Sequence, residues 1–200
     1  ISPLPACKLN IMSTPEFNTP PRVKALGEQI FDVAWTQPHI DDCNHELLHV
    51  RKGRLRLVLD GRAFLAEPGD TVLVPKGVEH RDEFPHDSTL EIFMIQFRWD
   101  HADAFFSVVN NDALANISRS THFTISRLLD TMRNDFGGDP IDRAIADARL
   151  HLLLLHIYRD VSVKRFKTAE DLVQAEDALV RKRQWLIEEA KQFLESNLSR

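Results

Sequence analysis

The sequence lacks several features that would place it in a well-defined class of protein. Its 200 residues contain two cysteines, Cys7 and Cys43, which could pair but are too few for a disulfide framework. No run of apolar residues is longer than four, so no segment is long enough to cross a bilayer. The start of the chain, ISPLPACKLN, has no apolar stretch of the kind that signal peptides carry. These absences favour a soluble, cytoplasmic protein with no membrane partner.

Basic charge is scarce as well. The chain has 25 Lys and Arg against 30 Asp and Glu, which gives a formal net charge of −5. A domain that grips DNA by itself usually shows a basic footprint, so these residues are not expected to bind DNA alone. Apolar residues make up 43%, which is enough for a core and too much for a disordered chain. The first residue is Ile1 rather than Met, which indicates a fragment of a longer protein.

Proline and glycine divide the chain near residue 100. Nine of the ten prolines and five of the seven glycines precede this point, interleaved with short alternating or β-branched runs. This pattern predicts short strands joined by tight turns, as in a sandwich or barrel, and Asp60-Gly61 is a two-residue hairpin signal. The predicted strands cover residues 30–35, 47–51, 54–59, 62–66, 71–75 and 90–99.

Helical periodicity dominates the second half. Ser120 or Thr121 is predicted to cap a first helix that Gly137-Gly138 ends. Asp139-Pro140 then supplies an N-cap and a proline at the first position of a second helix, which extends to about Arg159. The predicted apolar side of the first helix holds Phe123, Leu128, Leu129, Met132 and Phe136, and that of the second holds Ile141, Ile145, Ala148, Leu152 and Leu155. A sequence similar to a capping box at 168–171 precedes a last helical stretch over 172–193.

Two spaced patterns lie between residues 39 and 84. The first separates four residues by one, four and six positions, and these are His39, Asp41, Glu46 and Gly53. The second separates four residues by five, one and two positions, and these are Gly69, Pro75, Gly77 and His80. Because His39 and Asp41 are two apart on a predicted strand, their side chains are expected on one face, which Glu46 and His80 would reach from neighbouring strands.

These spacings resemble the two signature motifs of the cupin superfamily, whose fold is a small β-barrel, and the resemblance covers residues 30–98. The second motif departs only at Phe84, where the family has Asn. The first departs at Val33, where the family has Gly, and at Asp41, where it has His. The resemblance implies a divalent transition metal such as Zn, Ni, Fe or Mn, with ligands His39, Asp41, Glu46 and His80.

A pocket for an organic ligand without metal is the alternative interpretation of the same residues. Gln96 is the one amide in the otherwise apolar run 92–97, and we expect it to point into the barrel. The ligand-binding residues expected in this case are His39, Glu46, His80 and Gln96. Other histidines, such as His45 and His49, are expected to lie on the surface or to be hydrogen-bonded core residues.

A cupin barrel followed by two long helices resembles the sensing and dimerisation half of AraC/XylS-type transcription regulators. The text HELLHVRKGRLRLVLDGRAFLAEPGDTVLVPKGVEH is similar to that family's barrel. The implied fold class is α+β, a double-stranded β-helix (a jelly-roll-like cupin barrel) followed by a helical dimerisation segment. The implied divisions are an N-terminal arm at 1–22, an effector-binding barrel at 23–100, dimerisation helices at 101–180, and at 181–200 a linker with the first helix of a truncated helix-turn-helix domain.

The resemblance also implies partners. A sugar or small organic acid would bind in the barrel as effector, and a second copy of the chain would pair through the helices as a homodimer. DNA would be contacted only by the missing C-terminal domain. Two other interpretations stay open: a metal-dependent cupin enzyme, either isomerase or dioxygenase, and a structural dimerisation module with a filled barrel.

Overall fold

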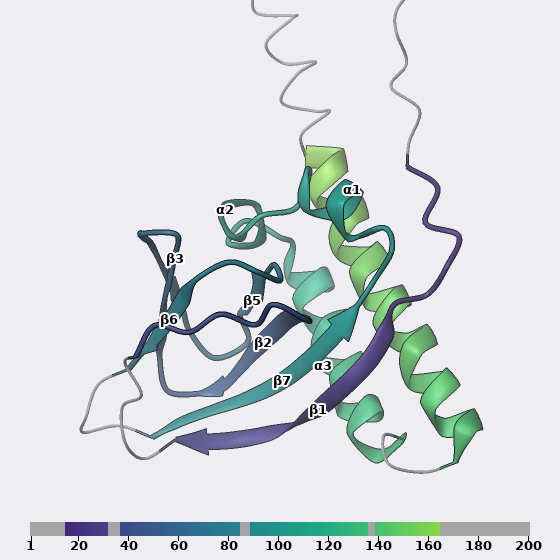
Figure 1. The fold of residues 1–200 in the computed structure, drawn as a ribbon, viewed down its shortest axis with the longest axis horizontal. Coiled ribbons are helices and arrows are strands. Elements are labelled where there is room, and N and C mark those ends of the chain that lie inside the picture. The colour runs from purple at the N-terminus through teal and green to yellow at the C-terminus, as the bar shows by residue number, and fades with distance from the viewer. Residues whose placement is uncertain (1–14, 32–36, 85–88, 136–138, 165–200) are drawn as a thin grey trace, which may run out of the picture.

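The computed structural model of the chain describes residues 15–31, 37–84, 89–135 and 139–164. In these ranges seven strands precede the helices, and Figure 1 shows their arrangement. The elements are β1 (Arg22–Phe31), β2 (His45–Lys52), β3 (Leu55–Leu59), β4 (Arg62–Ala66), β5 (Thr71–Val74), β6 (His80–Glu83), β7 (Leu90–Arg98), α1 (Ala102–Phe106), α2 (Asn111–Leu114) and α3 (Arg119–Asp135). A further helix occupies residues 140–164.

The strands form two antiparallel sheets that face one another. One has the order β1-β7-β2-β5 and the other the order β4-β3-β6. Leu48, Val50 and Ile92 of the first sheet pack against Leu55 and Leu57 of the second, and all five are buried. We call the space between the sheets the interior and this group of apolar residues the inner core.

The helices cover the opposite face of the four-stranded sheet (Figure 1). There Leu47 and Phe97 point away from the interior, because successive side chains of a strand alternate between its faces. They pack with Leu129 of α3 and Leu153 of the helix at 140–164 in a second, larger hydrophobic cluster, the outer core. Strands β2 and β7 of the four-stranded sheet are therefore covered on both faces, and the predicted α+β class is confirmed.

Most strand predictions agree with the structure, and two differ. Of the predicted strand at 30–35, the described residues 30 and 31 form the end of β1, which begins at Arg22 and has a bulge between Val23 and Ala25 that breaks the alternation. Strand β6 was not predicted, because its sequence HRDE is polar throughout. The hairpin at Asp60-Gly61 is confirmed, since both residues have positive φ, 47° and 75°.

Helix α3 begins earlier than predicted. Ser118, rather than Ser120 or Thr121, provides the N-terminal contact, because its Oγ accepts from the backbone N–H of Thr121 at 3.3 Å. Phe123 was predicted on the apolar side, but it is 70% exposed. The buried side of α3 holds Thr121, Ile125, Leu129 and Met132.

The helix at 140–164 is capped as predicted, with Asp139 Oδ1 accepting from the N–H groups of Ile141 and Asp142 at 2.7 and 3.0 Å. Its packed side differs from the predicted one. The residues that pack with the sheet and α3 are Leu150, Leu153, Leu154 and Ile157, all 0% exposed. Four residues of the predicted stripe are exposed instead, namely Ile141, Ile145, Ala148 and Leu152. Apolar residues lie on both sides of this helix, so periodicity alone did not identify the packed one.

Several predictions fall outside the described residues. These concern residues 32–35 of the first predicted strand with Val33, Phe136, the helix end at Gly137-Gly138, most of the arm at 1–22, the capping-box sequence at 168–171, the helical stretch at 172–193 and the segment at 181–200. Within the described ranges, Cys43 is exposed and forms no disulfide. In the same ranges, no helix combines the length and the apolar character that crossing a bilayer requires.

Candidate functional site

His39 and Asp41 lie where the chain approaches the start of β2. His39 forms an isolated pair of backbone hydrogen bonds with His80, at 2.9 and 3.0 Å. Asp41 lies in the following turn, and its Oδ1 accepts from the N–H groups of Cys43 and Asn44 at 2.7 and 2.9 Å. The prediction that His39 and Asp41 share a strand is therefore wrong. Asp side chains commonly hold turns in this way, by accepting from backbone groups two and three residues on.

Glu46 and Gln96 are opposite each other in the register of β2 and β7, and both side chains point into the interior. Gln96 Nε2 donates to Glu46 Oε1 at 2.9 Å and lies 3.4 Å from Asp41 Oδ2. Glu46 is buried. Burial alone would raise its pKa, but the contact with the His80 ring, whose Nε2 lies 3.4 Å from Oε2, and the hydrogen bond from Gln96 outweigh burial and hold the pKa below its ordinary value. Glu46 is therefore a buried carboxylate that stays ionised.

His80 begins β6 and is almost completely buried, with 1% of the residue exposed. Its Nε2 lies 3.4 Å from Glu46 Oε2, and its Nδ1 lies 3.3 Å from the Val78 carbonyl oxygen. The His39 ring lies against it, with centroids 3.9 Å apart. Burial lowers the pKa of His80, but the contact with Glu46 outweighs it, so the net pKa is raised. The five predicted site residues thus form one connected group that includes Asp41 and Gln96.

Asp82 belongs to the same group and was missed. It follows His80 by two positions on β6, so both side chains face the interior. That spacing was the available signal, had β6 been recognised as a strand. Burial raises the pKa of Asp82, and its Oδ1 has no hydrogen-bond partner. Beside it is a cavity of about 10 Å³, room for one water molecule, otherwise lined by Phe31, Leu55, Phe84, Leu90 and Ile92.

His45 and His49 alternate with Glu46 along β2 and point the other way, into the outer core. His45 Nδ1 accepts from the N–H of Lys76 at 3.0 Å. His49 Nδ1 lies 2.9 Å from Thr71 Oγ1. Burial lowers the pKa of each imidazole to about 4. They are the hydrogen-bonded core histidines that the sequence predicts, and they lie outside the interior.

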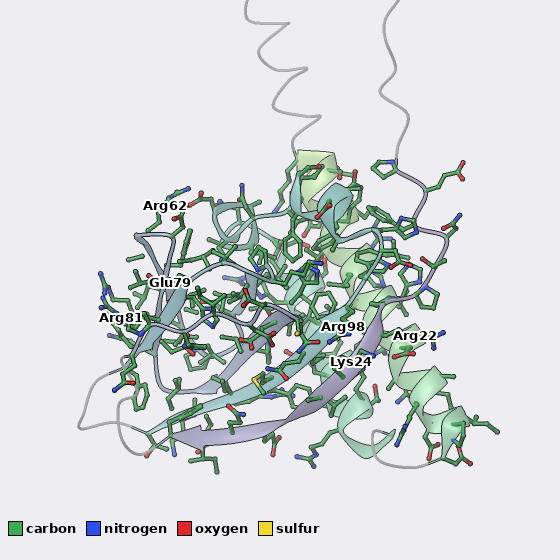
Figure 2. The ribbon with its side chains drawn as sticks, in the orientation of Figure 1. Arg22, Lys24, Arg62, Glu79, Arg81 and Arg98 are labelled. Carbon is green, nitrogen blue, oxygen red and sulfur yellow. The ribbon has the colours of Figure 1, made fainter. Side chains whose placement is uncertain are left out.

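Cationic side chains lie on the rim of the sheets. Arg22 and Arg98 are register partners at one end of β1 and β7, and Figure 2 shows Lys24 at the same end. Arg98 is exposed, and its Nε donates to Asn44 Oδ1 at 3.0 Å. Because Asn44 also donates to Asp41 Oδ2 at 3.0 Å, Arg98 supports the turn at the edge of the interior.

Two facing sheets with a helical cover and a polar group between the sheets suit a small-molecule binding domain. The family model for the AraC-like ligand-binding domain matches residues 25–154. The chain belongs to this family. The match covers most of β1, the other six strands described, α1, α2, α3 and most of the helix at 140–164. Sheets and helices therefore belong to one family domain, which has a cupin fold.

Solved structures similar to the chain are cupin proteins. A predicted oxalate decarboxylase from Thermotoga maritima is 14% identical, with 38% of this chain and 68% of that chain covered and a TM-score of 0.36. A cupin-2 domain protein from Shewanella frigidimarina is 23% identical, with 39% and 79% covered and a TM-score of 0.33. KdgF from Halomonas sp. is 21% identical, with 41% and 81% covered and a TM-score of 0.32. No curated protein matches the chain.

Proposed function

We propose that this AraC-like ligand-binding domain is the effector-sensing and dimerising part of a transcription regulator, with the effector bound in the interior. The observation that carries the proposal is the group formed by Glu46, His80 and Gln96, because buried polar side chains that converge between two apolar sheets are typical of ligand sites. DNA contacts belong, in this proposal, to a helix-turn-helix domain whose first helix the segment 181–200 resembles.

The chemistry of the group favours a neutral, hydroxyl-bearing effector, such as a sugar, over an organic acid. Glu46 is ionised and buried, and Asp41 and Asp82 bring two further carboxyl groups to the same place. Hydroxyl groups can donate to these oxygens, whereas the carboxylate of an acid would meet like charge in a medium of low dielectric constant. The cavity beside Asp82 is too small for an organic molecule. The effector would therefore contact the group from the side of Gln96.

A thermal-shift screen tests this proposal. Sugars and polyols are compared with small organic acids of similar size at equal concentration. A ligand present at 100 times its Kd stabilises the native state by about 2.7 kcal/mol, which raises the melting temperature of a domain of this size by roughly 5–10 °C. We expect at least one hydroxyl-bearing compound to give such a shift. If no compound of either class raises the melting temperature, the sensing function is wrong.

The outward side of the helix at 140–164 supports the homodimer. Ile141, Ile145 and Leu152 are 68%, 38% and 47% exposed. With Ala148 and Leu155 they are separated by alternate steps of four and three residues, the spacing of a coiled-coil seam. The opposite side of the helix is packed in the outer core. A second copy of the same helix, related by a two-fold axis, is therefore the partner that this stripe fits.

Sedimentation velocity at micromolar concentration tests the dimer. The wild type is expected to sediment as a dimer and Leu152→Glu as a monomer, because each subunit would bury a charge in the seam. Leu65→Glu is the matched control, since Leu65 is 65% exposed on β4, away from the helix. A monomeric wild type, or loss of the dimer in both variants alike, would contradict the proposed seam.

A metal-dependent cupin enzyme is the second candidate function. It is favoured by one observation, the proximity of His39, His80 and Asp82, whose ligand atoms all lie within 4.8 Å of one another. Turnover of a candidate substrate that requires added metal and is lost in His80→Ala would favour the enzyme over the sensor.

A further inference from the structure

We call the polar side chains between the sheets the interior group, namely His39, Asp41, Glu46, His80, Asp82 and Gln96. Three of them bring metal-ligating atoms close together. His80 and Asp82 alternate on β6, and His39 is paired through its backbone with His80. One ligand atom from each lies within 4.8 Å of the other two. Metal–ligand bonds of about 2.0–2.2 Å place neighbouring ligand atoms roughly 3–4 Å apart, so the three residues need only a small contraction to surround one ion.

Two buried atoms of this cluster lack a hydrogen-bond partner, namely His80 Nε2 and Asp82 Oδ1. Such atoms are uncommon, because each costs about 1–3 kcal/mol when it is left unsatisfied. The His80 side chain is 0% exposed, so bulk water does not reach it. Both atoms offer a lone pair, and a cation between them would accept both lone pairs at once.

The surrounding contacts orient His80 as a metal ligand. Its Nδ1 lies 3.3 Å from the Val78 carbonyl oxygen, and a carbonyl can only accept, so this nitrogen carries the hydrogen and Nε2 presents its lone pair to the cluster. Glu46 Oε2, 3.4 Å from His80 Nε2, is close enough to serve as a fourth ligand. Two imidazoles with one or two carboxylates suit a divalent transition metal.

Asp41 occupies a ligand position of the sequence motif but is engaged elsewhere. Its Oδ1 accepts from two backbone N–H groups of the turn, and its Oδ2 accepts from Asn44 Nδ2 at 3.0 Å. The nearest donor from the interior is Gln96 Nε2, at 3.4 Å. Moving Asp41 onto a metal would break the hydrogen bonds that hold the turn, whereas Asp82 Oδ1 has none to lose.

We propose that the interior binds one divalent transition metal through His39, His80 and Asp82, with Glu46 as the fourth ligand, and that Asp82 supplies the carboxylate in place of Asp41. Asp82 lies within the second motif, between His80 and Phe84, but at a position that the motif does not specify. Metal binding requires neither an effector nor an enzymatic reaction, so its test is independent of the test of the proposed function.

The test is titration of the chelator-treated full chain with CoCl2, followed by the visible absorption of protein-bound cobalt, and with ZnCl2 by calorimetry. We expect one equivalent to bind to the wild type. Asp82→Asn, which keeps the size of the side chain, is expected to weaken binding at least tenfold and to change the cobalt spectrum. Asp41→Asn and the exposed control Asp42→Asn are expected to stay within threefold of the wild type.

The proposal is overturned if Asp41→Asn weakens binding while Asp82→Asn does not, or if the wild type binds no metal under these conditions. Circular dichroism shows whether each variant folds. If Asp82→Asn does not fold, His39→Gln replaces it, because His39 is only half-buried and its loss is expected to weaken binding by a similar factor. Unchanged metal binding in a folded His39→Gln variant would equally overturn the proposed ligand set.

Discussion

Protonation of His49 is expected to destabilise the native protein at mildly acidic pH. The side chain is 1% exposed, between β2 and α3. Its Nδ1 lies 2.9 Å from Thr71 Oγ1, and its Nε2 lies 3.3 Å from Ser126 Oγ. Burial, assisted by the charge of Arg51, lowers its pKa from 6.5 to about 4. The native state therefore keeps this imidazole neutral at pH values where the unfolded chain protonates it.

The size of the effect follows from the two pKa values. Between pH 6.5 and pH 4 the unfolded state binds more protons than the native state, so stability falls as the pH falls. For a pKa of 6.5 in the unfolded state and about 4 in the native state, His49 contributes a loss of about 2 kcal/mol between pH 7.5 and pH 5. His45, with a pKa of about 4, adds a loss of similar size. His80, whose pKa is raised, acts in the opposite direction.

Urea denaturation at pH 7.5 and pH 5.0 measures this contribution. His49→Gln removes the titrating group, so the loss of unfolding free energy between the two pH values should be about 2 kcal/mol smaller than in the wild type. His45 and His80 remain in both proteins and cancel from the comparison. Ile125→Val, a buried change on α3 without a titrating group, should lower stability by about 1 kcal/mol equally at both pH values. If His49→Gln keeps the wild-type dependence on pH, the reasoning is refuted.

Two further predictions concern the backbone. In urea denaturation, Gly53→Ala should destabilise the protein clearly more than Gly61→Ala. Both glycines have positive φ, but a Cβ at Gly53 would lie 2.5 Å from the carbonyl oxygen of Thr89. At Gly61 an added Cβ would have no atom within 4 Å. Gly61→Ala should cost about 1–2 kcal/mol, and equal losses would contradict the steric argument. Asn111→Ala should lower the free energy of unfolding by about 2 kcal/mol in the same assay. Asn111 Oδ1 accepts from the N–H of Leu73 at 2.8 Å, and its Nδ2 donates to the C=O of Leu73 at 2.9 Å, at the edge of β5. Unchanged stability in Asn111→Ala would contradict that role.

Local signals in the sequence predicted local structure well. The Asp60-Gly61 hairpin follows from two adjacent residues that tolerate positive φ. Asp139 caps the last described helix because its short side chain reaches the first free N–H groups. Burial in the tertiary structure was harder to predict. The helix at 140–164 is apolar on two sides, and only the position of the sheet decides that Leu153 is packed while Leu152 is exposed.

For the candidate site too, some residues could be predicted from the sequence and others depended on the tertiary structure. Motif spacing predicted that His39, Glu46 and His80 meet at one place, and the structure brings them together because His39 pairs with His80 while Glu46 and His80 face each other from opposite sheets. The role of Asp41 depends on a turn that the spacing does not reveal. Asp82 was missed because β6 is polar, and its inward-facing residues meet the polar group rather than the inner core.

The central claim, that a small molecule binds between the two sheets, is tested most directly by NMR of methionine methyl groups. Met94 is partly buried against the inner core, next to the interior group, whereas Met132 is fully buried in the outer core and serves as an internal reference. With saturating amounts of the compound that raises the melting temperature most, the account predicts that the Met94 signal shifts and the Met132 signal stays in place. A Met94 signal that does not move at saturation would contradict the account.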